Sequence, residues 1–171
     1  MSRKLGFTGL IVIMILVGCG AGSEEKTADG WLSFNEGMEL AASSGKPVIV
    51  DFYTSWCKWC KVMDRDTFSN PEVKAALEKD FVTIRINAEN RKDKLRYKGK
   101  EYTPVELTRL FKVRGFPSLA YMESDGELIM VVPGFKKPDV FMPTLRYIID
   151  GCHRKGVTLD QYIRNGGECG K

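Results

Sequence analysis

The sequence predicts an α/β domain in which a central mixed sheet is flanked by helices on both faces. Residues 48–53 form a short β-branched and aromatic run between turn residues, which is typical of a strand buried on both sides. A helical stretch separates this run from a second one at residues 81–87, and this order favours parallel strands joined by a right-handed crossover. Residues 118–122 and 127–132 flank the turn residues 123–126 and predict an antiparallel hairpin, so the sheet is mixed.

The first eighteen residues have the features of an export signal rather than of a folded element. Arg3 and Lys4 supply positive charge, and the apolar run at residues 10–17 is too short to remain as a membrane-spanning helix. The run leads into Leu-Val-Gly-Cys, which resembles a bacterial lipobox and makes Cys19 the candidate for lipidation. The alternatives are an ordinary signal peptide cut near Ala21 and an uncleaved anchor helix.

The lipoprotein interpretation sets the expected organisation of the chain. Residues 1–18 would be a lipoprotein signal peptide, residues 19–30 a flexible tether of small and polar residues, and residues 31–150 a single domain. Residues 151–171 would form a C-terminal extension. The protein is then expected to be an exported bacterial lipoprotein, anchored to a membrane through lipid and facing the periplasm, where cysteines can form lasting disulfides.

The charge balance gives no indication of nucleic-acid binding. The chain has 171 residues, with 26 Lys and Arg against 22 Asp and Glu and a net charge of +4. Positive charge is concentrated locally at residues 91–100. Two interpretations of that segment stay open, a solvated loop face or a docking site for an acidic partner or an anionic lipid surface.

Capping residues and apolar spacing predict the helices in order. Ser33 and Glu36 fit a capping box at the start of a first helix. After the helix that contains Cys60, Asn70 and Thr103 are each followed by proline, which predicts the start of two further helices. Pro138 opens a closing helix with an apolar face.

Two segments have weaker patterns. Residues 88–102 are charged and weakly patterned, which predicts a long connection that is either mobile or functional. The C-terminal extension contains a short amphipathic piece around Tyr162, enclosed by Cys152 and Cys169. In an exported protein we expect a structural disulfide between these two cysteines, and the alternatives are a second redox pair or free thiols.

Cys57 and Cys60 are separated by two residues and stand where the strand at residues 48–53 gives way to a helix. The start of a helix presents unpaired N–H groups and the positive end of the dipole, which stabilise a thiolate. Cys57 is therefore the candidate nucleophile, and Cys60 can close a disulfide with it. Zinc is disfavoured because no second pair of this spacing exists, and a purely structural disulfide over so short a loop would add little stability. We predict no metal and no other cofactor.

Two motifs resemble those of the thioredoxin family. Val-Asp-Phe-Tyr-Thr-Ser-Trp-Cys-Lys-Trp-Cys-Lys at residues 50–61 is similar to the thioredoxin active-site segment, and Val-Arg-Gly-Phe-Pro-Ser at residues 113–118 is similar to the loop that carries the cis-proline. The resemblance covers residues 46–149 and implies a thioredoxin-like fold and thiol:disulfide exchange. It also implies that Cys57 attacks substrate disulfides and that Cys60 resolves the mixed disulfide.

Further site residues follow from the same resemblance. Asp51 matches the buried acid that assists proton transfer at the second cysteine, and burial in a sheet raises the pKa of a carboxyl. Arg85 stands where the family often has a lysine, and a guanidinium there would lower that pKa; the alternative is a purely structural carboxylate. Pro117 matches the cis-proline opposite the disulfide, and the backbone of Phe116 would pair with substrate. Trp56 would cover one side of the cysteine pair, or would be a core tryptophan.

The chain departs from the thioredoxin pattern between the cysteines, where Lys58 and Trp59 stand in place of Gly-Pro. Lys58 adds positive charge that favours the thiolate of Cys57, and Trp59 adds apolar surface that a protein partner could contact. A more stable thiolate makes the disulfide more oxidising, so the direction of electron flow stays open.

These observations favour a thiol:disulfide oxidoreductase that exchanges electrons with protein thiols and disulfides. We expect a monomeric periplasmic reductase that needs an electron-donor protein, which the sequence does not identify. The alternatives are an oxidase or isomerase that donates its disulfide, and a redox-inert adaptor that binds a partner through Lys58 and Trp59.

Overall fold

The computed structural model describes residues 30–170 of the chain. The predicted signal peptide, the lipidation site Cys19 and all but the last residue of the predicted tether lie outside the described residues. Within residues 30–170, we find no helix with the length and apolar character needed to span a membrane.

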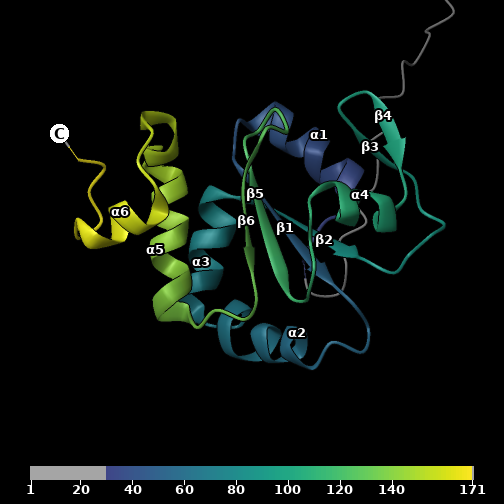
Figure 1. Cartoon of the computed structure of the whole chain (residues 1–171), viewed down its shortest axis with the longest axis horizontal. Helices are drawn as coiled ribbons and strands as arrows, with labels where there is room; N and C mark the ends of the chain where they lie inside the picture. Colours follow the sequence, from purple (N-terminus) through teal and green to yellow (C-terminus); the bar gives the residue numbers. More distant parts are fainter. Residues whose placement is uncertain (1–29, 171) are drawn as a thin grey trace, which may run out of the picture.

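A four-stranded mixed sheet forms the centre of the fold (Figure 1), with the strand order β2-β1-β5-β6. β2 runs parallel to β1, whereas β5 is antiparallel to both β1 and β6. The predicted crossover and the predicted hairpin are therefore both confirmed. The bounds of the strands are β1 Val48–Tyr53, β2 Val82–Asn87, β5 Ser118–Met122 and β6 Leu128–Pro133.

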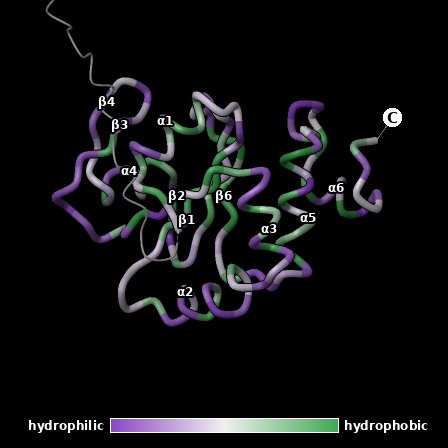
Figure 2. The backbone as a smooth tube through the Cα atoms, turned by 180° about the vertical axis from the view of Figure 1, so that it is seen from behind, coloured by the Kyte–Doolittle hydropathy of each residue, from purple (hydrophilic) through white to green (hydrophobic). Residues whose placement is uncertain are grey.

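Helices cover both faces of the sheet, as predicted (Figure 1). Side chains of β1 alternate between the two faces, so that Val50 and Phe52 pack with α1 and α4 while Ile49 packs with α3 and α5. Figure 2 shows the most apolar segments in the central strands, where these two cores meet. α2 lies across one end of the sheet and continues into a π-helical turn, Asp64–Phe68. The bounds of the helices are α1 Phe34–Ser44, α2 Lys58–Met63, α3 Pro71–Asp80, α4 Pro104–Leu110 and α5 Pro138–Ile149.

Local capping interactions account for where the helices begin. The side chain of Asn70 accepts hydrogen bonds from two backbone N–H groups in the first turn of α3. Thr103 and Glu106 form a complete capping box at the start of α4. Ser33 is the N-cap of α1, but its hydroxyl donates to the carboxylate of Glu36 and does not cap a helical N–H group.

Residues 88–102, for which the sequence predicts a long connection, contain a small hairpin that was not predicted. Its antiparallel strands are β3 (Leu95–Tyr97) and β4 (Lys100–Tyr102). Leu95 and Tyr97 are buried in the core that contains α1 and α4, and the Tyr97 hydroxyl donates to the carbonyl of Gly126 at 3.1 Å. Each strand has only three residues, too few for an alternating pattern to be visible in the sequence.

The C-terminal extension is packed against α5 (Figure 1). It contains a 3₁₀ turn, Cys152–Lys155, and α6 (Leu159–Arg164). Tyr162 of α6 is 2% exposed, and its hydroxyl donates to Asp150 at 2.7 Å. A disulfide joins Cys152 to Cys169, with the Cα atoms 5.0 Å apart. The extension therefore contributes buried residues to the folded unit.

A cluster of charged side chains holds the extension to the turn between β5 and β6. The guanidinium of Arg154 donates to the carboxylate of Glu123, with its Nε at 2.7 Å, and Nε2 of His153 lies 2.8 Å from the same carboxylate. The hydrogen bond from Arg154 lowers the pKa of Glu123 to about 2, against the opposing effect of burial, and His153 adds to the lowering.

We predict that Glu123 makes folding stability depend on pH in the acid range. Because folding lowers the pKa of this carboxyl from 4.5 to about 2, its contribution is present above pH 4.5 and is lost as the pH falls towards 2. The shift corresponds to at most about 3 kcal/mol. Urea unfolding of Glu123→Gln should show lower stability at neutral pH and a flatter dependence on pH. The matched control is Glu127→Gln, which removes an exposed ion pair with Lys98 and should change the stability little. If the unfolding free energy depended on pH equally in the unmodified protein and in both variants, the prediction would be contradicted.

Candidate active site

A disulfide between Cys57 and Cys60 lies where β1 leads into α2. Its S–S distance is 2.11 Å and its Cα atoms are 5.3 Å apart. Cys57 is the N-cap of α2, and its Sγ accepts a hydrogen bond from the backbone N–H of Cys60 at 3.0 Å. An N–H group directed at the sulfur stabilises a thiolate, which is the property expected of an attacking cysteine. Both cysteines are at most 4% exposed, so the residues around the pair control access to it.

The loop before β5 lies beside the disulfide. The register of β1 with β5 pairs Phe52 with Ser118, so Pro117 lies at the same end of the sheet as the cysteine pair. The peptide bond between Phe116 and Pro117 is cis. The ring of Phe116 packs edge-on against Trp56, with the centroids 6.3 Å apart. The fold thus brings together the two motifs that are far apart in the sequence.

Two tryptophans, one before the cysteine pair and one between its two cysteines, are open to solvent. Trp56 is 67% exposed and Trp59 is 57% exposed, so Trp56 is not a core residue. Trp59 stacks on Phe135, which precedes α5, with the centroids 5.6 Å apart and the rings 28° from parallel. Sequence reasoning missed Phe135, because nothing in the sequence indicates that its loop reaches α2. Lys58 is exposed on α2 between the two tryptophans.

A buried ion pair lies within the sheet near the cysteine pair. Asp51 of β1 is paired in register with Arg85 of β2, and their side chains are 1% and 10% exposed. Nε and Nη2 of Arg85 both lie 2.9 Å from Oδ2 of Asp51. Nη2 of Arg85 also binds Asp64, which follows α2. The guanidinium lies over the rings of Tyr53 and Trp31, at 5.0 and 5.4 Å from their centroids.

A small pocket of about 180 Å³ lies beside Cys60. Asp51 does not line it, and contacts the pocket through Arg85. Asp64 does line it, although sequence reasoning did not select this residue. It stands four positions after Cys60, which places the two on one face of a helix, so the spacing could have identified it. The lining residues are Tyr53, Thr54, Ser55, Cys60, Lys61, Asp64 and Arg85.

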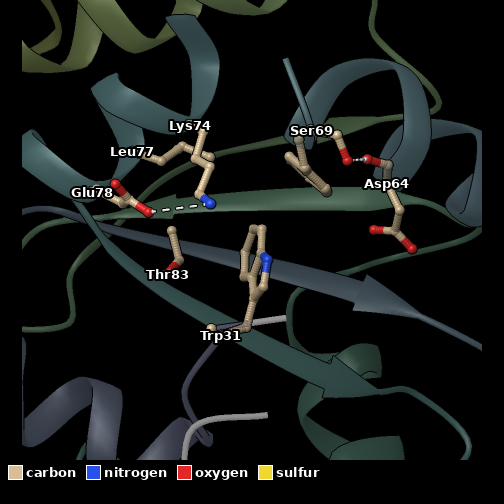
Figure 3. A pocket seen from close by; sticks show the side chains of 9 residues that line it. Trp31, Asp64, Ser69, Lys74, Leu77, Glu78 and Thr83 are labelled. Carbon is tan, nitrogen blue, oxygen red and sulfur yellow. Dashed lines mark hydrogen bonds and ion pairs between the residues drawn. The ribbon is translucent and has the colours of Figure 1, made fainter. Parts of the chain in front are cut away.

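A larger cavity, of about 550 Å³, lies between α3 and β2 (Figure 3), and neither cysteine of the disulfide lines it. Trp31 and Leu77 line it, and the ion pair between Lys74 and Glu78 lies at its edge. Asp64 is the one residue that it shares with the pocket beside Cys60. Among residues 30–170, no group of three or more His, Cys, Asp and Glu side chains is placed to hold a metal ion.

A Cys-x-x-Cys disulfide at the start of a helix, beside a cis-proline loop on a mixed sheet, defines the class of thiol:disulfide oxidoreductases. The family model described as "Thioredoxin-like domain" matches residues 34–149, and the chain belongs to this family.

Comparisons with individual proteins agree with this assignment. The "Thiol:disulfide interchange protein DsbD" of Ralstonia nicotianae is 30% identical over 127 residues, which cover 72% of this chain but only 19% of that protein. A thioredoxin from Thermus thermophilus superposes with a TM-score of 0.57 and 25% identity, covering 70% of this chain and 85% of the other. A thioredoxin-fold protein from Helicobacter pylori gives a TM-score of 0.59 at 19% identity, covering 65% and 73%, and supports the fold.

We predict that Arg85 stabilises the fold through its ion pairs with Asp51 and Asp64. Arg85→Met leaves the buried Asp51 without its cation and should lower the free energy of unfolding by about 3–5 kcal/mol at neutral pH. Adding Asp51→Asn to that variant removes the buried charge and should recover much of the loss. Guanidinium unfolding followed by fluorescence measures both effects. As a control, Arg65→Met removes an exposed ion pair with Asp66 and should cost less than about 1 kcal/mol. Equal losses for the two arginine variants would contradict the prediction.

Proposed function

We propose that this protein is an exported thiol:disulfide oxidoreductase that acts as a reductase of protein disulfides. The observation that carries the proposal is the Cys57–Cys60 disulfide at the start of α2, beside the cis peptide bond of Pro117. The name of the Ralstonia nicotianae relative, a thiol:disulfide interchange protein, supports the same chemistry.

The proposed reaction proceeds through a mixed disulfide. The thiolate of reduced Cys57 attacks one sulfur of a substrate disulfide, and the other substrate sulfur leaves as a thiolate. Cys60 then loses its proton and attacks Sγ of Cys57, which releases the second substrate sulfur and forms the Cys57–Cys60 disulfide. Two electrons pass to the substrate, so a dithiol protein must return two electrons to the pair before the next cycle.

We assign the proton transfer at Cys60 to the charged groups beside it. Asp51 is the proposed acceptor, with Arg85 and Asp64 connecting it to the pocket that Cys60 lines. Nε of Arg85 donates a hydrogen bond to Oδ2 of Asp51, and Nη2 of Arg85 forms an ion pair with the same oxygen, so the proposed acceptor is held in place beside the pocket. Asp64 is 42% exposed and in contact with solvent, so it offers a route by which a proton can leave the pocket.

The remaining roles concern substrate binding and location. Trp56, Lys58, Trp59 and Phe116 are proposed to contact the substrate, and Pro117 to shape the backbone beside it. The Cys152–Cys169 disulfide is proposed to be structural, because it joins the end of the extension to a residue that lies just after α5. Lipidation at Cys19 and periplasmic exposure rest on the lipobox-like sequence.

We predict that the protein catalyses the reduction of insulin by dithiothreitol and that Cys57→Ser abolishes this activity. Cys60→Ser should instead accumulate a mixed disulfide with the substrate, because Cys57 can still attack but nothing resolves the product. Cys152→Ser/Cys169→Ser, confirmed to be folded by circular dichroism, is the matched control and should retain activity. Insulin reduction that is unchanged in Cys57→Ser would overturn the proposed function.

The direction of electron flow is tested separately, by the reduction potential of the Cys57–Cys60 pair. A reductase should equilibrate near the thioredoxin value of about −270 mV, whereas a potential near −120 mV would identify an oxidant. Equilibration with glutathione or thioredoxin, followed by alkylation of free thiols and mass spectrometry, measures it.

A further inference from the structure

Three segments that meet at the disulfide carry positive charge and no negative charge. Residues 54–61, 113–118 and 133–137 contain no Asp or Glu, although the chain as a whole has 22 acidic residues against 26 basic ones. We call the basic residues of these segments the basic collar: Lys58, Lys61, Arg114, Lys136 and Lys137.

Contacts between the segments place the collar around the disulfide. The ring of Trp56 meets Phe116, two residues after Arg114, and the ring of Trp59 stacks on Phe135, directly before Lys136. The backbone N–H of Gly134 donates to the carbonyl of Pro117 at 2.8 Å. The collar residues are therefore carried by α2 and by two loops that contact each other and the residues next to the cysteines.

The collar is not neutralised by the rest of the fold. None of its five side chains forms an ion pair with another residue in the range 30–170. Lys136 donates to the backbone carbonyl of Pro133 at 2.6 Å, which leaves its charge in place. The two acids in the π-helical turn that follows α2 are already engaged, Asp64 by Arg85 and Asp66 by Arg65.

The positions of some of these charges do not favour stability. Lys137 is the N-cap of α5, a helix of twelve residues, and the dipole of a helix disfavours a cation there. Lys58 and Lys61 lie on one short helix and repel each other weakly at their spacing of three residues. Basic side chains without an acidic partner, grouped around a reactive disulfide with two exposed tryptophans, are the pattern of a recognition surface.

We propose that the redox partner of this protein presents its cysteines in an acidic segment that docks on the basic collar, with apolar side chains against Trp56 and Trp59. The inference rests on the proposed function, because the docked segment must carry the disulfide or dithiol that exchanges with Cys57. A protein segment fits this surface better than an anionic membrane does, because lipid seated on the collar would block the disulfide that it surrounds.

The test compares two synthetic peptides with the same central cysteine, each supplied as its symmetric disulfide. Four Glu residues flank the cysteine in one peptide and four Lys residues in the other. The full chain is purified in neutral detergent and reduced with dithiothreitol. The dithiothreitol is then removed, and the reduced protein is mixed with each peptide. One reduced protein converts one peptide disulfide into two peptide thiols and becomes the Cys57–Cys60 disulfide. Acid-quenched chromatography of the peptide thiol gives the rate.

The proposal predicts that the acidic peptide reacts about tenfold faster than the basic one at low salt, because opposite charge raises the rate of encounter. The preference should shrink as NaCl is raised from about 20 mM to about 500 mM, since salt screens exposed charges. Arg114→Glu/Lys137→Glu should lose or reverse the preference. The matched control is Lys155→Glu/Arg164→Glu, which changes two exposed basic residues in the C-terminal extension beyond α5 and should keep it (Figure 1).

Other outcomes overturn the inference in distinguishable ways. Equal rates for the two peptides, together with normal insulin reduction, reject the acidic partner and leave the proposed function intact. No exchange with insulin or with either peptide rejects both. If the peptides react equally and the collar variant instead loses binding to phosphatidylglycerol vesicles, the collar is a membrane-docking surface and the inference is wrong.

Discussion

The parallel pairing of β1 with β2 is the constraint on which the candidate site depends. Side chains alternate along a strand, so a slip of one residue would send Asp51 and Arg85 to opposite faces of the sheet. The alternation in β2 holds the register, because Ile84 and Ile86 must face the core that contains α1. Removing a carboxylate and a guanidinium from water is costly, and the hydrogen-bonded ion pair and two aromatic rings offset that cost here. The same pairing directs the chain out of β1 at the end of the sheet where Cys57 begins α2.

Those parts of the fold that are encoded locally could be predicted from the sequence. β1 is apolar at nearly every position, and the start of α4 is marked by Thr103, Pro104 and Glu106 within four residues. The hairpin at residues 95–102 could not be predicted in this way, because its short strands become regular only through contacts made by distant residues. Asn35 of α1 supplies such contacts, donating to the carbonyl of Lys94 and accepting from the N–H of Arg96.

The residues of the candidate site also differ in whether local sequence is enough to predict them. The cysteine pair and the cis-proline loop are short motifs and can be found in sequence. Phe135 could not be found, because its role comes from a stacking contact with Trp59 that exists only once α5 is packed. The two aromatic contacts, Trp56 with Phe116 and Trp59 with Phe135, also explain why large exposed rings can be held in place. Each tryptophan is supported on one side and open on the other, as a preformed docking surface requires.

The disulfide therefore separates two electrostatic environments. On the inner side, Arg85 pairs with both Asp51 and Asp64; on the outer side, the basic collar lies around Cys57, and its Lys61 also lines the pocket beside Cys60. Positive charge near Cys57 stabilises its thiolate and with it the reduced form of the pair. An acidic segment that docks on the collar would offset that stabilisation in the complex, so the reduced pair would give up its electrons more readily when a partner is bound. A collar that favours the reduced form in the free protein, and loses this effect on docking, would suit the proposed role of a reductase, which has to store electrons until a substrate arrives.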